Sequence, residues 1–273
     1  MTTFKRDGLD LWFEERGAGP PVVLHTGGGG DSDMFVAAGY ADALVDAGYR
    51  VICFDHRGHG RSSKPLRREQ HLTREYVEDV VGLLDTLGVQ SAAIVGYSQG
   101  MHIAVALAAS HPERVAAVVG IGSVGAADDS PEWRTGAAAS VRESGMEAAM
   151  RAIADQENPK PPEWLIENLS ATDDEVFALL LEAQLDDDKE LWEFFPDVHA
   201  PTLLVVGENE EDEDDTDPGA AARNARTATE TLPHAQAHIV PGARHLAVFW
   251  RTDLTMPVIC RFLSASYPAE PSN

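Results

Sequence analysis

The sequence predicts an α/β fold: a mostly parallel, doubly wound sheet of eight strands that carries a helical insertion. Two observations indicate this fold. Short runs rich in Val, Ile and Leu recur along the chain, and helical patterns separate them, as in sheets that helices cover on both faces. The runs lie at residues 21–25, 50–55, 92–97, 115–122, 201–207 and 235–240.

The chain begins with a pattern typical of two antiparallel edge strands. Residues 4–15 alternate apolar and polar side chains around Asp7-Gly8, a dipeptide suited to a hairpin turn. Residues 72–88 instead place apolar side chains at helical spacing, with Thr73 available as the N-cap. This second segment predicts an amphipathic helix that connects two parallel strands.

Strand patterns stop between about residues 126 and 197, where helical patterns carry several aromatic side chains. Thr172 and Glu175 have the spacing of a capping box, which predicts a helix start there. We therefore predict a core formed by residues 1–125 and 198–273, with residues 126–197 as a helical cap over the carboxyl edge of the sheet, where open α/β sheets bind ligands. The tryptophans of the cap either line a substrate pocket or form the cap's own core. They are Trp133, Trp164 and Trp192.

Length and charge exclude several classes of protein. The 273 residues suffice for one large hydrophobic core. The 21 basic residues face 45 acidic ones, which gives a formal charge of −24. Such a surface repels phosphate backbones and anionic lipids, so we expect a small-molecule substrate and neither a nucleic acid nor a membrane as partner. Whether the chain forms a homo-oligomer is left open.

Cysteine usage and hydropathy predict a cytoplasmic protein. Cys53 and Cys260 lie in apolar runs, where a small buried hydrophobe would serve, so no disulfide framework is expected. The first ten residues lack the apolar region of a signal peptide, and no run of 18 apolar residues occurs.

The acidic segment 207–219 is the compositional outlier of the chain. A solvated loop explains it best. A calcium loop of the EF-hand type would need a central glycine, which is absent. We expect neither a metal nor an organic cofactor.

A serine between two glycines follows the predicted strand 92–97 and precedes an alanine-rich helical pattern. Such a serine is either a helix cap or a nucleophile. Gly96-Tyr97-Ser98-Gln99-Gly100 has the G-x-S-x-G pattern of a nucleophile elbow, in which a sharp turn lifts the serine out of the sheet. Side chains at the glycine positions would crowd the neighbouring strand and helix.

A nucleophilic serine needs a base, and the base needs an orienting carboxylate. For this arrangement the chain order is serine, acid, histidine. His245 follows the last predicted strand and is the candidate base. Glu210, after strand 201–207, is the first candidate for the acid, and Asp212 is the second. The other histidines have structural explanations: His56 and His59 in a polar turn, His102 in the helix after the serine, and His71, His111, His199, His234 and His238 at surface positions.

Acyl transfer also needs hydrogen-bond donors for the oxyanion. The first would be the backbone N–H of Gln99, the residue after the nucleophile. The second would come from the glycine-rich loop 25–31, with Gly27 as the first choice and Gly28 as the second. The same loop could cradle a phosphate, but the residues that complete a nucleotide site are missing.

Taken in order, these motifs resemble the α/β-hydrolase superfamily over nearly the whole chain. The resemblance includes the loop at 25–30, D-x-R-G-x-G-x-S at 55–62, the elbow, the strand at 200–208 and the P-G-x-x-H sequence at 241–245. It implies a structural role for residues 55–62, as a turn beside the active-site loop. Three positions depart from the family pattern: Thr26 and Arg244 replace common glycines, and Glu210 stands where aspartate is usual.

The resemblance implies a capped member such as an esterase, an enol-lactonase, a C–C bond hydrolase or a cofactor-free haloperoxidase. Serine at the elbow, in place of aspartate, argues against the dehalogenase and epoxide-hydrolase branches. We expect hydrolysis of a small carboxylic ester or lactone through an acyl-enzyme. The alternatives are a C–C bond hydrolase or perhydrolase with the same triad, and a non-catalytic ligand-binding protein of this fold.

Overall fold

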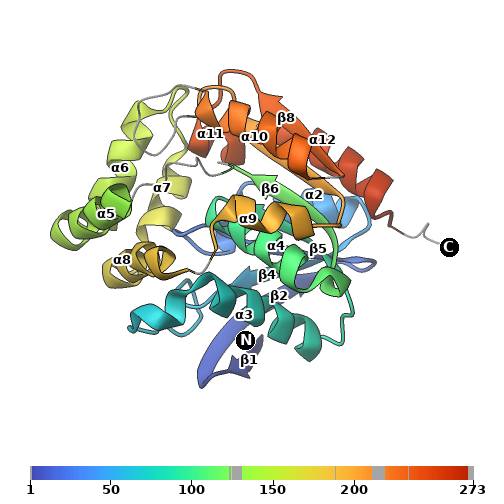
Figure 1. Cartoon of the computed structure of the whole chain (residues 1–273), viewed down its shortest axis with the longest axis horizontal. Helices are drawn as coiled ribbons and strands as arrows, with labels where there is room; N and C mark the ends of the chain where they lie inside the picture. The colour runs from blue at the N-terminus through green and yellow to red at the C-terminus, as the bar shows by residue number, and fades with distance from the viewer. Residues whose placement is uncertain are drawn as a thin grey trace.

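A computed structural model describes residues 2–122, 124, 131–187, 189–210, 219–232 and 234–269. Within these residues, eight strands form one sheet in the order β1-β2-β4-β3-β5-β6-β7-β8 (Figure 1). The strands are β1 (Thr2–Arg6), β2 (Leu9–Arg16), β3 (Pro21–His25), β4 (Arg50–Asp55), β5 (Ala92–Tyr97), β6 (Val115–Ile121), β7 (Thr202–Gly207) and β8 (Ala235–Val240).

The strand directions confirm the predicted fold class. β1 pairs with β2, and β2 with β4, in antiparallel fashion, while every pairing from β4 through β3 to β8 is parallel. The hairpin turns at Asp7 and Gly8, which adopt φ angles of 51° and 80°. Positive φ at both positions matches the twist of a tight hairpin.

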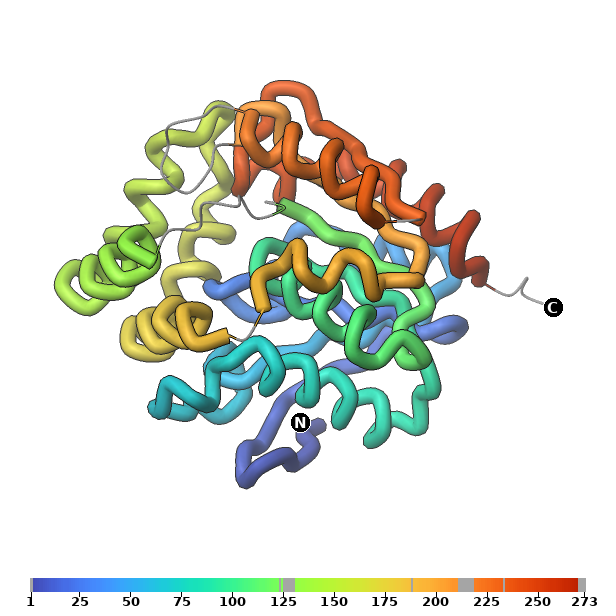
Figure 2. Tube along the Cα trace, in the orientation of Figure 1, coloured from blue at the N-terminus to red at the C-terminus, as the bar shows by residue number. Residues whose placement is uncertain are grey.

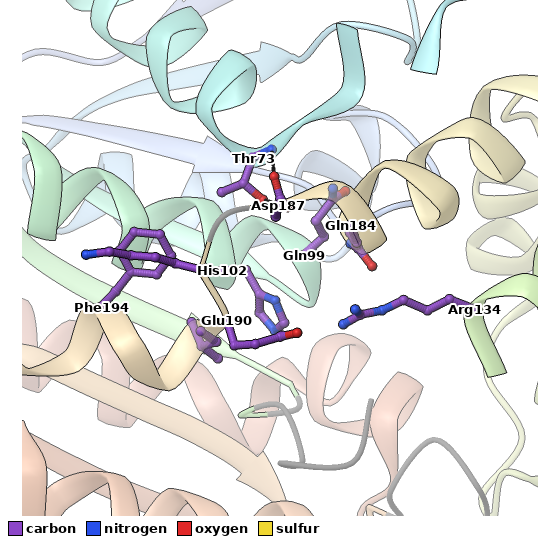
Figure 3. A pocket seen from close by; sticks show the side chains of 10 residues that line it. Thr73, Gln99, His102, Arg134, Gln184, Asp187, Glu190 and Phe194 are labelled. Carbon is purple, nitrogen blue, oxygen red and sulfur yellow. Dashed lines mark hydrogen bonds between the residues drawn. The ribbon is translucent and has the colours of Figure 1, made fainter. Parts of the chain in front are cut away.

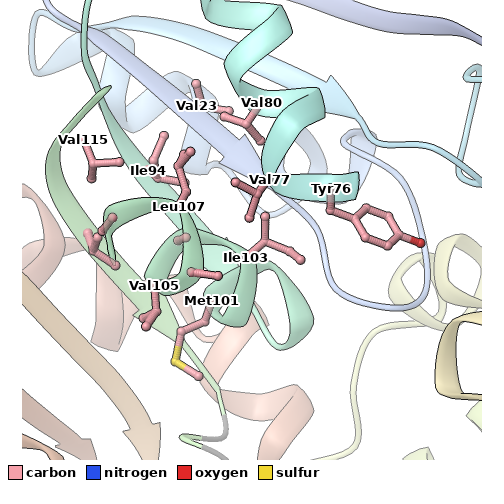
Figure 4. Close-up of a cluster of buried hydrophobic side chains, with 14 of the residues drawn as sticks. Val23, Tyr76, Val77, Val80, Ile94, Met101, Ile103, Val105, Leu107 and Val115 are labelled. Atoms are coloured by element: carbon pink, nitrogen blue, oxygen red, sulfur yellow. The ribbon is translucent and has the colours of Figure 1, made fainter. Parts of the chain in front are cut away.

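Helices cover both faces of the sheet, as expected for a doubly wound fold. The helices α3 (Thr73–Thr86), α4 (Gln99–Ser110) and α10 (Ala220–Thr231) lie on one face, over the hydrophobic cluster that Figure 4 shows around Val23, Ile94 and Ile103. The helices α1 (Asp33–Ala37), α2 (Tyr40–Asp46), α11 (His245–Trp250) and α12 (Thr252–Ser266) pack against the other face. Alternate residues of the central strands point into the two clusters, so the strands are buried on both sides.

Between β6 and β7 the described chain is helical. Its helices are α5 (Pro131–Ser144), α6 (Met146–Gln156), α7 (Glu163–Ser170), α8 (Asp174–Ala183) and α9 (Leu191–Phe194). Helices α5 to α8 lie together beside the sheet, whereas α9 lies over α4 on the core (Figures 1 and 2). The limits of a separate cap at 126 and 197 stay a prediction.

Two helix starts differ from expectation, for the same reason. Thr73 is the first residue of α3, not its N-cap, because the Asp187 carboxylate accepts hydrogen bonds from the Thr73 N–H at 2.9 Å and from its hydroxyl. Helix α8 is capped by Asp173, whose carboxylate accepts from two backbone N–H groups of the first turn. Thr172 Oγ1 instead accepts from the Gly30 N–H at 2.8 Å. Both threonines therefore serve contacts between distant segments.

No helix in the described ranges is both long and apolar enough to cross a membrane.

Candidate active site

The turn between β5 and α4 has the geometry of a nucleophile elbow. Ser98 adopts φ 53° and ψ −120°, a conformation that costs a non-glycine residue of the order of 1–3 kcal/mol. A β-carbon at Gly96 would lie 2.1 Å from the Gly100 carbonyl oxygen, and one at Gly100 would lie 2.2 Å from the His25 oxygen. Neither position can hold a side chain, so the two glycines allow the sharp turn that exposes Ser98 at the carboxyl end of β5.

Glu210 and His245 meet at the same edge of the sheet. The His245 Nδ1 donates to Glu210 Oε1 at 2.5 Å, and the Gly207 N–H at the end of β7 donates to Glu210 Oε2 at 3.0 Å. Only 1% of Glu210 is exposed. A carboxylate tied to a strand end on one side and to an imidazole on the other is held in one orientation. The second candidate acid, Asp212, lies outside the described residues.

Two carboxylates set the protonation of His245. Burial lowers the pKa of His245, but the charge and hydrogen bond of Glu210 and the charge of Glu157 outweigh burial, so the pKa lies above its ordinary value. Glu157 is buried and follows α6 in the helical insertion. Its Oε1 accepts from the Leu246 N–H at 2.8 Å, directly after the histidine.

Ser98 and His245 are brought to the same edge through β6. The Ser98 N–H donates to the Ile121 oxygen at 2.8 Å, and a β-carbon at Gly122 would lie 3.0 Å from His245 Cε1. Tyr97 stacks on the imidazole with 5.1 Å between ring centroids. Ser98 and His245 both belong to the part of the chain that the structure describes. The Ser98 Oγ makes no hydrogen bond to the His245 ring in this structure. Catalytic hydrogen bonds are commonly long before substrate binds.

The two expected oxyanion donors lie beside the serine. Gln99 is the first residue of α4, so its N–H is among the helix amides that lack an intrahelical partner. A β-carbon at Gly27 would lie 3.5 Å from Ser98 Oγ, which places this residue of the loop against the nucleophile. Gly28 lies further along, between Gln99 and the side chains of α8.

A narrow cavity of about 30 Å³ opens next to Gln99 (Figure 3). Its lining is mostly polar and joins α4 to the helical insertion; it includes Thr73, His102, Arg134, Asp187 and Glu190. A second cavity, of about 260 Å³, lies between the loop 30–33 and α7.

None of the three tryptophans expected to line a pocket is among the residues around these two cavities. Trp133 and Trp164 pack against the two hydrophobic clusters, and Trp192 is 39% exposed. Their role in substrate binding stays a prediction.

One buried histidine was assigned wrongly from the sequence: His71 is not on the surface but 0% exposed. His56 and His59 lie at the expected turn after β4, and both are 0% exposed as well. The turn after β4 folds beneath the glycine-rich loop, so its histidines contact backbone there. The D-x-R-G-x-G-x-S motif was the available signal, because the resemblance places it beside the active-site loop. Over the described residues, no group of three or more His, Cys, Asp or Glu side chains could hold a metal ion.

Comparison with known proteins identifies the fold family. A family model described as the alpha/beta hydrolase fold matches residues 20–172, more than half of the chain. The chain belongs to the α/β-hydrolase fold family. The enol-lactonase from Burkholderia xenovorans LB400 shares this fold with a TM-score of 0.81 and 26% identity, over 96% of this chain and 100% of that one. An esterase from Thermogutta terrifontis gives a TM-score of 0.79 at 24% identity, over 97% of each chain.

Similar sequences in this α/β-hydrolase family include enzymes of different activities. Epoxide hydrolase B from Mycobacterium tuberculosis is 48% identical over 79 residues, which are 29% of this chain and 22% of that protein. A zearalenone hydrolase from Cladophialophora bantiana is 34% identical over 116 residues, 42% of this chain and 43% of its own. The chain thus matches less than half the length of these relatives. The four similar proteins named above are hydrolases or esterases that act on different substrates.

Proposed function

We propose that the chain hydrolyses a small carboxylic ester or lactone through an acyl-enzyme, with Ser98 as nucleophile, His245 as base and Glu210 as the acid that orients it. The observation that carries the proposal is the contact of 2.5 Å between His245 Nδ1 and a buried Glu210, at the sheet edge where the elbow presents Ser98. A serine, a histidine and a carboxylate in this relation form the arrangement that activates a hydroxyl at neutral pH.

In this mechanism the proton path follows from the hydrogen bonds. Because Nδ1 of His245 donates to Glu210, the other ring nitrogen, Nε2, takes the proton as Ser98 Oγ attacks the carbonyl carbon. The amides of Gln99 and Gly27 hold the oxyanion. His245 then returns the proton to the leaving alcohol oxygen. It next takes a proton from the water that attacks the acyl-enzyme, and gives it to Ser98 Oγ as the bond to the acyl carbon breaks and the acid is released.

The nucleophile type favours acyl transfer over epoxide opening, although epoxide hydrolases occur among the relatives. A carboxylate that opens an epoxide forms an ester, which water can cleave at its carbonyl carbon. A serine that opened an epoxide would form an ether, and neither an oxyanion hole nor a histidine base would release it. Ser98 can complete a catalytic cycle only with a substrate that leaves it acylated.

The substrate that we propose is a small molecule. We propose that this small molecule is the only partner the activity needs, with no metal or organic cofactor, and that the enzyme works in the cytoplasm. The strongly negative formal charge supports a soluble substrate over a lipid surface or a nucleic acid.

Intact-protein mass after incubation with a fluorophosphonate tests the proposal. We expect one adduct on the wild type and none on Ser98→Ala, because the reagent reacts with an activated serine. Aryl esters and lactones would then be screened for turnover. A folded wild type that gains no adduct and cleaves no ester would indicate a ligand-binding protein of this fold.

A further inference from the structure

Three histidine side chains that the proposed mechanism does not use lie stacked in the interior. His25 ends β3, and His56 and His59 follow β4; each is 0% exposed. The rings of His25 and His56 are stacked, with 4.8 Å between centroids and planes 8° apart. The ring of His59 lies 3.9 Å from that of His56. We refer to these three residues as the histidine stack.

The histidine stack contacts three successive carbonyl oxygens of the glycine-rich loop. The distances are 2.9 Å from His25 Nδ1 to Thr26 O, 3.1 Å from His56 Nε2 to Gly27 O, and 2.7 Å from His59 Nε2 to Gly28 O. A carbonyl oxygen can only accept a hydrogen bond. An imidazole ring that bonds to a carbonyl must therefore carry a proton on the nitrogen that faces the oxygen.

The protons of His25 and His59 can be assigned from their partners. Burial lowers the pKa of His25 to about 4 and also lowers the pKa of His56 and His59, so each ring is neutral near pH 7 and has one N–H to donate. His25 Nε2 has no hydrogen-bond partner, which places its proton on Nδ1. Both nitrogens of His59 face carbonyls, and the one toward Gly28 is closer, at 2.7 Å against 3.1 Å for Arg57. Both nitrogens of His56 also face carbonyls, Nδ1 that of Arg57 at 3.0 Å and Nε2 that of Gly27 at 3.1 Å, so a proton on Nε2 of His56 is part of the proposal and is tested below.

A hydrogen bond to the carbonyl of one residue also fixes the direction of the N–H of the next residue. The C=O and N–H of a trans peptide lie in one plane and point in opposite directions. Carbonyls 26, 27 and 28 point toward the stack, so the amides of Gly27, Gly28 and Gly29 point away from it. Ser98 lies beside the first of these residues. Glycines have great conformational freedom, and Gly30, the last of four in a row, is held at its own amide by Thr172, so the contacts of the stack restrict the three peptide groups before it.

We propose that the histidine stack positions the backbone amides of the loop for binding the oxyanion, with one ring for each of three successive peptide groups. The inference rests on the proposed acyl transfer. His25, His56 and His59 are positioning residues in this scheme, because they act through the loop and do not touch the substrate. The proposal also predicts what each ring serves: His25 the amide of Gly27, which lies against Ser98, and His56 that of Gly28, while His59 fixes the peptide before Gly29, which lies against Met146 and Leu169.

Pairs of variants test the stack ring by ring. His25→Leu, His56→Leu and His59→Leu remove the donor, while His25→Asn, His56→Gln and His59→Gln place an amide N–H near the nitrogen that donates. Two quantities are measured for each on the full chain: kcat and KM for a p-nitrophenyl ester, and the inhibition constant of a trifluoromethyl ketone, which forms a tetrahedral adduct with the serine.

We expect the leucine variants of His25 and His56 to lower kcat about 10- to 100-fold with KM changed less than threefold, since oxyanion donors act mainly in the transition state. Ketone affinity should fall in parallel, and the amide variants should recover part of both losses. His71→Leu is the matched control. His71 is also fully buried and packs near the stack through Tyr76, but its ring nitrogens bond to Tyr76 and Pro65 and not to a carbonyl of the loop, so its replacement should lower the melting temperature and leave kcat within threefold.

The outcomes separate this inference from the proposed function. Leucine variants that fold and keep the wild-type kcat, or lose it no more than His71→Leu at equal melting temperature, overturn the positioning role alone. A wild type with neither ester turnover nor ketone binding overturns the acyl-transfer proposal and, with it, this inference. Should the leucine variants not fold, ring nitrogen shifts of the ¹⁵N-labelled wild type decide: Nδ1–H on His25 with Nε2–H on His56 and His59 supports the stack, and the opposite tautomers overturn it.

Discussion

His245 and the histidine stack place the same side chain in two environments with opposite results. Burial lowers the pKa in both, yet the pKa of His245 ends above the ordinary value and that of His25 falls to about 4. The difference lies in the partners. Glu210 and Glu157 bring full negative charges to His245, whereas the stack faces backbone carbonyls, which carry only partial charges. The charge of the partner, and not the depth of burial, decides which ring can take up a proton near neutral pH.

This contrast separates two uses of imidazole. A ring that gains and returns a proton during each cycle needs a carboxylate to stabilise its cationic form. A ring that only donates one hydrogen bond to a loop works best when it stays neutral throughout. We therefore expect substitutions at the reacting residues and substitutions in the histidine stack to lower kcat by different amounts.

The largest expected effect is on the reacting pair. Ser98→Ala and His245→Ala should each lower kcat for an ester by about 10⁵- to 10⁶-fold, because the nucleophile and base act as one unit. The free energy of unfolding should change little for Ser98→Ala. Steady-state kinetics with a p-nitrophenyl ester measure the loss, and near-normal turnover in either variant would contradict the mechanism.

The acid should matter next. Glu210→Gln keeps the size of the side chain but removes the charge that stabilises protonated His245, so we expect a loss of about 10²- to 10⁴-fold in kcat. Asp212→Asn, two residues further along, is the matched control and should cost less than threefold. The opposite ranking would assign the acid to Asp212.

The sequence predicted most of the scaffold and named Glu210 and His245, which the structure brings into contact. All six runs that indicated parallel strands are strands, because a strand buried on both faces needs a continuous apolar run. Gly96 and Gly100 marked the elbow through a steric requirement that only glycine meets. Features that depend only on residues close in the sequence can therefore be predicted from the sequence alone.

Contacts between distant segments could not be predicted in the same way. Glu157 lies in a polar stretch that reads as surface, yet it is buried against the start of α11. His56 and His59 sit among polar and basic neighbours, and only the three-dimensional course of the loop above them explains their burial. Thr172 was expected to cap a helix and bonds to Gly30 instead. In each of these examples the burial or the bonding partner of the side chain depends on a segment that is distant in the sequence and that the fold brings into contact with it.

The contributions of His25 and His245 to the free energy of unfolding should change with pH in opposite directions. His25 has a pKa of about 4 in the folded state against 6.5 unfolded, so its contribution is complete above pH 6.5 and is lost as the pH falls toward 4. The shift corresponds to about 3 kcal/mol. His245, with a raised folded pKa, contributes below its unfolded pKa, and this contribution is lost as the pH rises through the folded value.

Urea unfolding of the wild type, His25→Asn and His245→Gln between pH 4.5 and 8.5 measures these contributions. His25→Asn should flatten the decline on the acid side, and His245→Gln should flatten the change above neutral pH. Equal slopes in all three proteins would mean that neither ring is perturbed as described.

The smallest effect we expect comes from Glu157, and it tests whether the helical insertion contributes to the base. The charge of Glu157 is the last and weakest of the influences that raise the pKa of His245. Glu210, the other carboxylate that raises this pKa, stays in place. Glu157→Gln keeps an acceptor for the Leu246 N–H while removing the charge, so His245 should lose its proton more readily. The acid limb of the kcat/KM profile should therefore move to lower pH by roughly half a unit or less, with kcat at its plateau nearly unchanged. A shift to higher pH, or none, would mean that Glu210 alone sets the protonation of the base and that Glu157 only anchors the insertion to the start of α11.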